Sequence, residues 1–133
     1  MELLLSGDDE ALLERLDNFD KIEERPLPDA LNAKLRPYQR DGYNWLSFLY
    51  EQRFGACLAD DMGLGKTIQA IALLAGIKEG KVRQAGEPLL PHLLVLPPSL
   101  LFNWHSEMSR FCPDFKLHFY TGKERSMTFD GSD

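Results

Sequence analysis

The sequence has few of the features that mark membrane, secreted or metal-binding proteins. Its 133 residues contain two cysteines, Cys57 and Cys112, which lie far apart, and three histidines that do not cluster with other metal ligands. We therefore predict two reduced core thiols and no metal site built from cysteine or histidine. No apolar run approaches the roughly 18 residues that cross a bilayer. Leu3–Leu5 has no basic residue before it, unlike a secretory signal, so the expected location is inside the cell.

Excess positive charge is missing as well. The chain has 15 Lys and Arg against 21 Asp and Glu, a formal net charge of −6. Residues 1–33 hold ten acidic and three basic side chains, whereas residues 34–133 hold eleven acidic and twelve basic ones. The nearly neutral second part neither requires nor excludes a polyanionic partner. We place a boundary here, between an acidic helical arm with a proline-containing linker (1–33) and a domain (34–133).

The spacing of apolar residues predicts the helices and strands. In the arm, Asp8 or Asp9 precedes four apolar residues at helical spacing, which are Leu12, Leu13, Leu16 and Phe19. Further helices are expected from about 37 to 53, from 66 to about 78, and from a cap at Ser99 to about 111. Short apolar runs at 55–59, 93–96 and 115–120 are typical of buried strands. This alternation predicts an α/β fold, a mostly parallel sheet with flanking helices preceded by a helical N-terminal arm.

The helix that begins near residue 37 is expected to bury one stripe of its surface. The stripe consists of Tyr38, Gly42, Trp45, Leu46 and Leu49. These residues recur at the spacing that keeps side chains on one face of a helix.

The segment Asp60–Thr67 (DDMGLGKT) stands between a predicted strand and a predicted helix, which is the setting of a phosphate-binding loop. Its glycines let successive N–H groups point at phosphate oxygens, and the helix N-terminus adds its positive end. Lys66 supplies a charge for the β- and γ-phosphates, and the Thr67 hydroxyl supplies a ligand for Mg²⁺. Asp60 stands where the general pattern has glycine, so the alternative is a glycine-rich turn that binds nothing. Because Lys66 and Thr67 are both in place, we predict binding of a nucleoside triphosphate, ATP above others.

With aspartate at that position, the run DDMGLGKTIQ at 60–69 resembles motif I of the Swi/Snf-type ATPases, which are superfamily-two, helicase-like DNA translocases with RecA-like motor lobes. Two more segments resemble motifs of this family in the same order. LRPYQRDGYNWL at 35–46 is similar to its adenine-recognising Q motif, and LVLPPSLLFNW at 94–104 is similar to its motif Ia. The compact spacing and the LPDALNA lead-in at 27–33 look most like the bacterial members. The resemblance thus implies a bacterial cytoplasmic protein associated with the nucleoid.

The resemblance also implies roles for single residues. Gln39 would read adenine, because an amide both donates and accepts hydrogen bonds. Lys66 and Thr67 would act in catalysis, with Thr67 holding Mg²⁺. Pro98 and Ser99 would contact the phosphate backbone of double-stranded DNA without sequence preference. The residues expected to bind nucleotide are Arg36, Gln39, Asp61, Met62, Gly63, Leu64, Gly65, Lys66 and Thr67.

Two catalytic elements of this family do not occur in the sequence: an Asp-Glu-x-His-like motif II after residue 100, and a second lobe with an arginine finger. We therefore expect 34–133 to be the N-terminal part of the first motor lobe, which binds ATP without hydrolysing it, while the full-length protein is an ATPase. Its sheet edges would be exposed and would favour self-association; no membrane contact is expected. The alternatives are another P-loop NTPase, such as a kinase or another helicase branch, and a non-catalytic module that binds nucleotide or protein.

Overall fold

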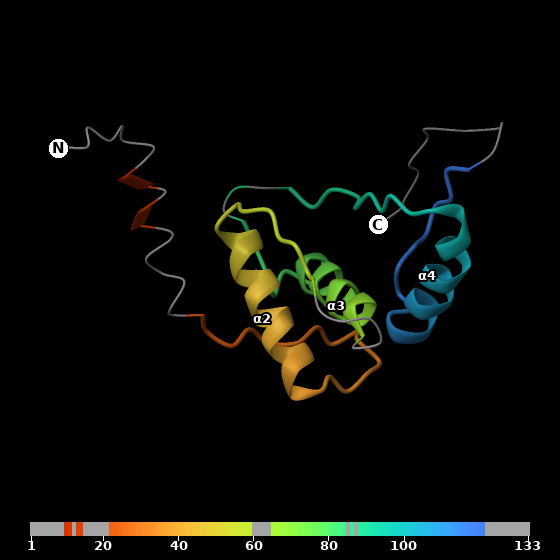
Figure 1. Ribbon diagram of the computed structural model, residues 1–133, viewed down its shortest axis with the longest axis horizontal. Coiled ribbons are helices and arrows are strands. Elements are labelled where there is room, and N and C mark those ends of the chain that lie inside the picture. Colours follow the sequence, from red (N-terminus) through yellow and green to blue (C-terminus); the bar gives the residue numbers. More distant parts are fainter. Residues whose placement is uncertain are drawn as a thin grey trace.

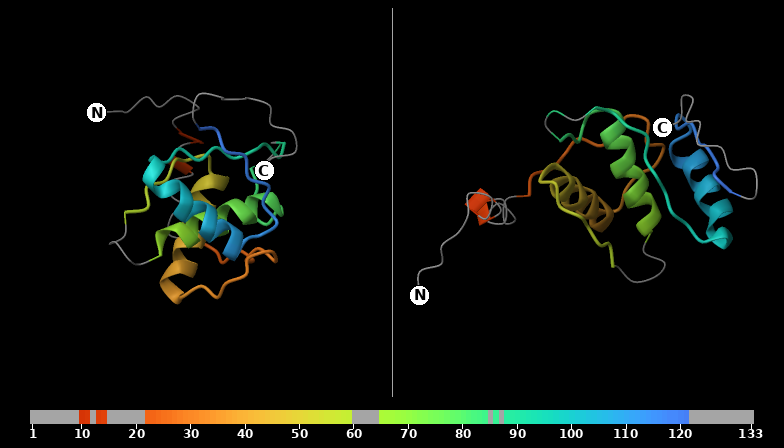
Figure 2. Two further views of the ribbon diagram at one scale, coloured as in Figure 1. Left: turned by 90° about the vertical axis from the view of Figure 1, so that its right-hand side faces the viewer. Right: turned by 90° about the horizontal axis from the view of Figure 1, so that it is seen from above.

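Three helices form the frame of the part of the chain that the computed structural model describes, which is residues 10, 11, 13, 14, 22–59, 65–84, 86 and 88–121. Proline starts α2 (Pro37–Glu51) and α4 (Pro98–Phe111), because a proline in the first turn loses no helical hydrogen bond. Helix α3 (Lys66–Lys78) lies between them and contacts both, as Figure 1 and the view from above in Figure 2 show. These bounds agree with the predicted helices, except that the cap of α4 is Pro97 rather than Ser99.

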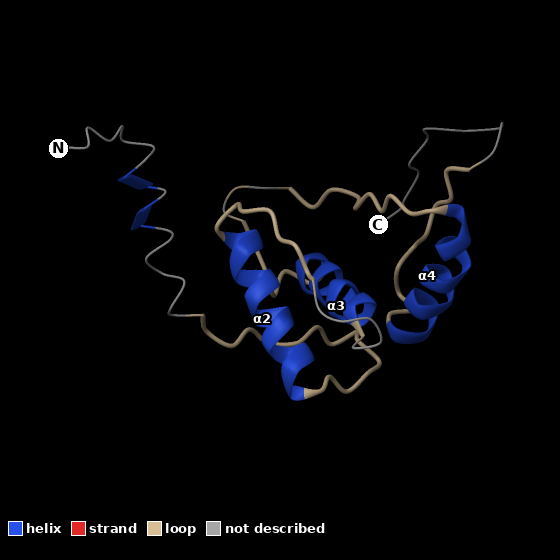
Figure 3. Cartoon of the chain, viewed as in Figure 1, coloured by secondary structure: helices blue, strands red, loops and turns tan. Residues whose placement is uncertain are grey.

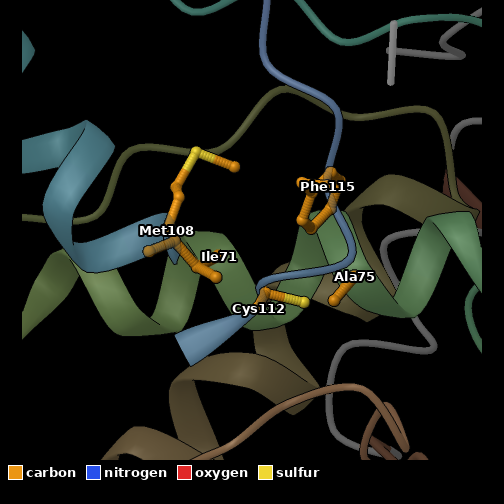
Figure 4. Packing of buried hydrophobic residues seen from close by; sticks show 5 residues of the cluster. All are labelled: Ile71, Ala75, Met108, Cys112 and Phe115. Atoms are coloured by element: carbon orange, nitrogen blue, oxygen red, sulfur yellow. The ribbon is translucent and has the colours of Figure 1, made fainter. Parts of the chain in front are cut away.

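Helix α3 is buried from two sides because its sequence is apolar around most of its circumference. The cluster between α3 and α4 consists of Ile71, Ala75, Met108, Cys112 and Phe115 (Figure 4). The cluster between α2 and α3 consists of Tyr43, Ala72, Ile77 and Val82. The helix that begins at the predicted phosphate loop is thus the centre of the core.

Residues 25–32, which we call the strap, run across the helices and begin by binding α2. The Arg25 guanidinium contacts the Glu51 carboxylate at 2.6 and 3.3 Å, and the Arg25 N–H donates to the Asn44 side chain at 2.9 Å. The Tyr43 hydroxyl donates to the Pro26 carbonyl at 2.8 Å. These bonds explain why a proline-containing segment without helix or strand holds a defined path.

The far end of the strap binds the C-terminal ends of α3 and α4. The Glu79 carboxylate, just after α3, accepts hydrogen bonds from the backbone N–H groups of Asp29 at 2.8 Å and Ala30 at 3.2 Å. The Asn32 N–H donates to the carbonyl of Phe111, the last residue of α4, at 2.6 Å. The strap therefore joins all three helices. It falls within the region assigned to the arm, and the boundary after residue 33 stays a prediction.

The prediction of a mostly parallel sheet is wrong for the described residues, which form three helices and no strand (Figure 3). A strand exists only where its N–H and C=O groups bond to a neighbouring strand. The described residues place no such partner beside segments 55–59, 93–96 or 115–120. Lacking cover, Leu93 is 79% exposed and Val95 is 86% exposed. An apolar run shows that a segment suits the interior of a sheet; it does not show that the neighbouring strands are present.

Burial corrects two further predictions. Cys112 lies in the core as expected, but Cys57 is exposed because it falls in the uncovered segment 55–59. On α2, Leu46 and Leu49 of the predicted stripe are buried, yet the most buried aromatic residue is Tyr43, which lies outside that stripe. Helix α3 and the strap together cover this second face of α2.

Little of the predicted arm helix is described. Residues 10, 11, 13 and 14 are helical. The predicted caps and three of the four apolar positions lie outside the described residues; these are Asp8, Asp9, Leu12, Leu16 and Phe19. None of the described helices combines the length and the apolar character needed to cross a membrane.

Candidate functional site

The N-terminus of α3 has a backbone that suits an anion. Gly65, the N-cap residue, has φ 75° and ψ 48°, a left-handed conformation that glycine adopts without steric cost. It has no side chain with which to cap the N–H groups of the first turn, which lack partners within the helix. Lys66 and Thr67 are the first two residues of α3, and both are half-buried. A cation, a hydroxyl and the positive end of a helix dipole therefore meet where a phosphate would bind.

Gln39, from the segment similar to the Q motif, lies against Gly65. It occupies the first turn of α2 and is buried, and its Oε1 accepts a hydrogen bond from the Arg36 N–H at 2.9 Å. Its Nε2 stands where the β-carbon of any larger residue at position 65 would lie. The predicted base-reading side chain and the predicted phosphate loop are thus in contact, although 26 residues separate them in the sequence.

The other predicted site residues divide into two groups. Arg36 is exposed at the N-cap of α2, and Pro98 and Ser99 are exposed in the first turn of α4, whose N–H groups suit a phosphate oxygen. Five residues of the predicted loop lie outside the described residues, namely Asp60, Asp61, Met62, Gly63 and Leu64. The structure therefore brings Gln39 together with Gly65 at the start of the Lys66–Thr67 turn, and it leaves the front of the loop as a prediction.

Sequence reasoning missed one residue beside the site. Gln69, in the second turn of α3, is fully buried, and its Nε2 donates to the Gly65 carbonyl at 3.4 Å. A helical glutamine is usually exposed, so the residue type alone does not predict that Gln69 is buried. The available signal was its spacing of four residues from Gly65, which places the two on the same side of the helix.

An apolar hollow of about 540 Å³ lies elsewhere, beside α4. Its walls come from residues 91–96, α4 and residues 115–121, and they include Leu94, Trp104 and Leu117. A triphosphate needs convergent donors and cations, whereas these walls are mostly apolar and contain no lysine or arginine, so the hollow does not fit the nucleotide. Within the described part of the chain, no three His, Cys, Asp or Glu side chains gather closely enough to hold a metal ion.

A known protein family and several of its members are similar in sequence to this chain. The family model of the SNF2-related domain matches residues 38–131. The putative ATP-dependent helicase/translocase YwqA of Bacillus subtilis (strain 168) is 44% identical over 115 residues, which are 86% of this chain and 12% of that protein. The human chromatin-remodeling ATPase INO80 is 48% identical over 100 residues, 75% of this chain and 6% of that protein. The chain therefore spans a small part of the length of these relatives.

Solved structures agree with these relatives. The Sulfolobus solfataricus SWI2/SNF2 ATPase core in complex with dsDNA matches with a TM-score of 0.59 and 44% identity, over 66% of this chain and 18% of that chain. The SWI2/SNF2 ATPase core domain of the same organism matches with a TM-score of 0.62 and 40% identity, over 75% of this chain and 20% of that chain. With the three ordered motifs and the contact between Gln39 and Gly65, these matches show that the chain belongs to the SNF2-related domain family, the Swi/Snf-type helicase-like ATPases.

Proposed function

We propose that this chain is the ATP-binding front part of the motor of a Swi/Snf-type, DNA-dependent ATPase. The observation that carries the proposal is the approach of the Gln39 amide to Gly65, immediately before Lys66. A nucleotide has a base at one end and phosphates at the other, so its site needs a base reader close to a phosphate cradle. Helix α2 supplies the first and the start of α3 supplies the second.

Each residue has a definite task in this proposal. The Lys66 ammonium neutralises phosphate charge, while the N–H groups at the start of α3 donate to phosphate oxygens. The Thr67 hydroxyl would hold Mg²⁺, which would supply positive charge against the phosphates. Gln39 and Arg36 would contact the base. Binding is the task of this chain, and hydrolysis requires further groups that position water and stabilise the transition state in the longer protein.

For the nucleic-acid partner we propose the phosphate backbone of double-stranded DNA. Pro98 and Ser99 are exposed where α4 begins, and a helix N-terminus is suited to a phosphate oxygen. The solved relative that binds dsDNA supports this choice. Such contacts read no base sequence, which suits a translocase that steps along any DNA. The corresponding location is the bacterial cytoplasm, at the nucleoid.

The test is binding of a fluorescent ATP analogue to this chain in the presence of Mg²⁺. Lys66→Ala should weaken binding by about tenfold or more, because charge-assisted hydrogen bonds contribute roughly 1.5–3 kcal/mol. Lys116→Ala, at an exposed lysine far along the chain, is the matched control and should bind normally. Gln39→Ala should abolish the preference for ATP over GTP while leaving phosphate-dependent binding. A wild-type chain that binds no ATP, or a Lys66→Ala variant that binds as well as wild type, would contradict the proposal.

A further inference from the structure

Gln69 is a buried polar side chain for which packing alone gives no reason. It is fully enclosed between α2 and α3, and its Oε1 has no hydrogen-bond partner. Burying an unpaired amide oxygen costs free energy that an apolar side chain of the same length would not cost. A residue that served only to fill this space would be better as methionine or leucine.

The amide nitrogen of Gln69 makes one contact, and that contact is with the phosphate loop. It donates to the Gly65 carbonyl at 3.4 Å, the carbonyl at which the hydrogen-bond ladder of α3 begins. Gly65 is the left-handed residue that turns the chain into Lys66 and Thr67. On its other side Gly65 meets the Nε2 of Gln39. Two buried glutamine amides, one from each helix, therefore lie against the exposed glycine that turns the chain into α3.

The facing helix is shaped to admit Gln69. A β-carbon at Gly42 of α2 would overlap the Gln69 Oε1 and approach its Cδ to 2.9 Å. The amide thus occupies the place that a side chain on Gly42 would take. Close approach of an oxygen to a glycine α-carbon gives that oxygen a weak C–H donor, which partly compensates for its missing partner. Gly42 and Gln69 form an interlocked pair that fixes how α2 lies against the start of α3.

We propose that Gln69 is a positioning residue for the phosphate loop, holding the Gly65 carbonyl so that Lys66 and Thr67 face the triphosphate. This inference rests on the proposed function and assigns to that same site a residue that touches no ligand. Because Gln69 acts on the loop and not on the base, its loss weakens the binding of ATP and of GTP by the same factor. The preference between the two bases stays with Gln39.

The first experiment is Gln69→Met, which keeps the length of the side chain and removes the amide. The melting temperature should stay the same or rise, because the unpaired buried oxygen is gone. The affinities for fluorescent ATP and GTP analogues, each with Mg²⁺, should fall about fivefold to tenfold by the same factor, the worth of one hydrogen bond of about 1–1.4 kcal/mol. The affinity for inorganic triphosphate, measured by competition, should fall by the same factor. A Gln69→Met variant that binds ATP as tightly as wild type overturns the inference.

The second experiment separates positioning from space filling. Gly42→Ala should lower the melting temperature because its β-carbon overlaps Gln69, and Gln69→Ala should lower it by leaving a cavity. In the double variant the new methyl group enters the vacated space, so the melting temperature should recover while triphosphate affinity remains low. Recovery of both properties would show that Gln69 only fills space. Gly55→Ala is the control, since a β-carbon there meets nothing within 4 Å.

The two ideas fail in different ways. If the wild-type chain binds no triphosphate, the proposed function fails before Gln69 is tested. If the wild-type chain binds ATP and Lys66→Ala does not, while Gln69→Met binds normally, the proposed function stands and the positioning role is wrong.

Discussion

Replacing Tyr43 with phenylalanine tests how the strap stabilises the helices. The ring of Tyr43 is fully buried, and its hydroxyl donates to the Pro26 carbonyl at 2.8 Å. Tyr43→Phe keeps the ring and removes the hydrogen bond to Pro26, so the free energy of unfolding at neutral pH should fall by about 1 kcal/mol. Pro26 is exposed, so water can replace the lost donor and the larger penalty of a buried unpaired carbonyl does not apply. Urea denaturation of the wild type and the variant measures the difference.

The same variant has a pH signature. Burial raises the pKa of Tyr43 above its ordinary value of about 10, although the nearby Ser47 hydroxyl and the charge of Arg40 act in the opposite direction. Because the folded pKa exceeds the unfolded one, the stability that this implies is fully present below about pH 10 and is lost as pH rises through the folded pKa. The advantage of the wild type over Tyr43→Phe should therefore shrink above pH 10. Burial also raises the pKa of Cys112, but both proteins contain that thiol, so its effect cancels.

Tyr120→Phe, at a half-exposed tyrosine, is the matched control and should change stability at neutral pH by less than about 0.5 kcal/mol. The reasoning is refuted if Tyr43→Phe is as stable as wild type at neutral pH. It is refuted equally if the difference between the two proteins does not change between neutral and alkaline pH.

Three further predictions concern the strap, the core and the uncovered segments. Arg25→Met should lower the free energy of unfolding by about 1–3 kcal/mol, because Arg25 and Glu51 form a largely buried pair with side chains 13% and 24% exposed. A double-mutant cycle with Glu51→Gln should give a clear coupling energy, and additive losses would contradict the pairing. Met108→Ala should lower the free energy of unfolding by about 2–5 kcal/mol, because it leaves a cavity in the core. Phe102→Ala, at a residue 77% exposed, should lower it by less than about 0.5 kcal/mol, and similar losses for the two variants would refute this placement of the core. Val95→Lys should reduce self-association in sedimentation experiments, because a charge on an uncovered apolar segment opposes its pairing with another copy of the chain. A wild-type chain that is monomeric at all concentrations would show that prediction to be wrong.

The helices could be predicted because their signals are local. Pro37 marks the start of α2 and Gly65 marks the turn into α3, whereas α4 begins at Pro98, before the predicted cap at Ser99. The buried face of α2 was predicted less well. Helical spacing favoured the stripe from Tyr38 to Leu49, while the bond from Tyr43 to Pro26 shows that another face is covered. That cover comes from α3, against which Tyr43 packs, and from Pro26, 17 residues earlier. No local pattern indicates where either segment folds back.

The sheet was predicted incorrectly for a different reason. The runs at 55–59 and 93–96 have strand composition, but composition measures the suitability of a segment for pairing, and a strand requires the pair. The side chains show the consequence, since Val95 is exposed while Leu96 is half-buried beside it. Neighbouring residues of 93–96 thus differ in burial, and the outer side that a second layer would cover in a parallel sheet is open.

At the candidate site, resemblance identified residues that the structure then related to one another. The order of the motifs predicted Gln39 and Gly65 as site residues. Their contact depends on how α2 crosses α3, which neither motif indicates. Gln69 stands inside the same motif I run, yet its role is visible only from its burial and from the glycine opposite it. Motif order therefore predicted a set of site residues without Gln69, and packing gave the geometry of those that the structure describes.

The three helices constrain how the two ends of the chain can act on one another. Within the described part, α2 and α4 do not touch; each contacts α3 (Figure 1). The strap is the other connection, bound to Tyr43 on α2, to Glu79 after α3 and to Phe111 at the end of α4. Among the described residues, a displacement of α2, which carries the proposed base reader, relative to α4 is then transmitted through α3 or through the strap. Since α3 begins at the predicted phosphate loop, a nucleotide bound there that moved its first turn would act directly on the element that both neighbours share.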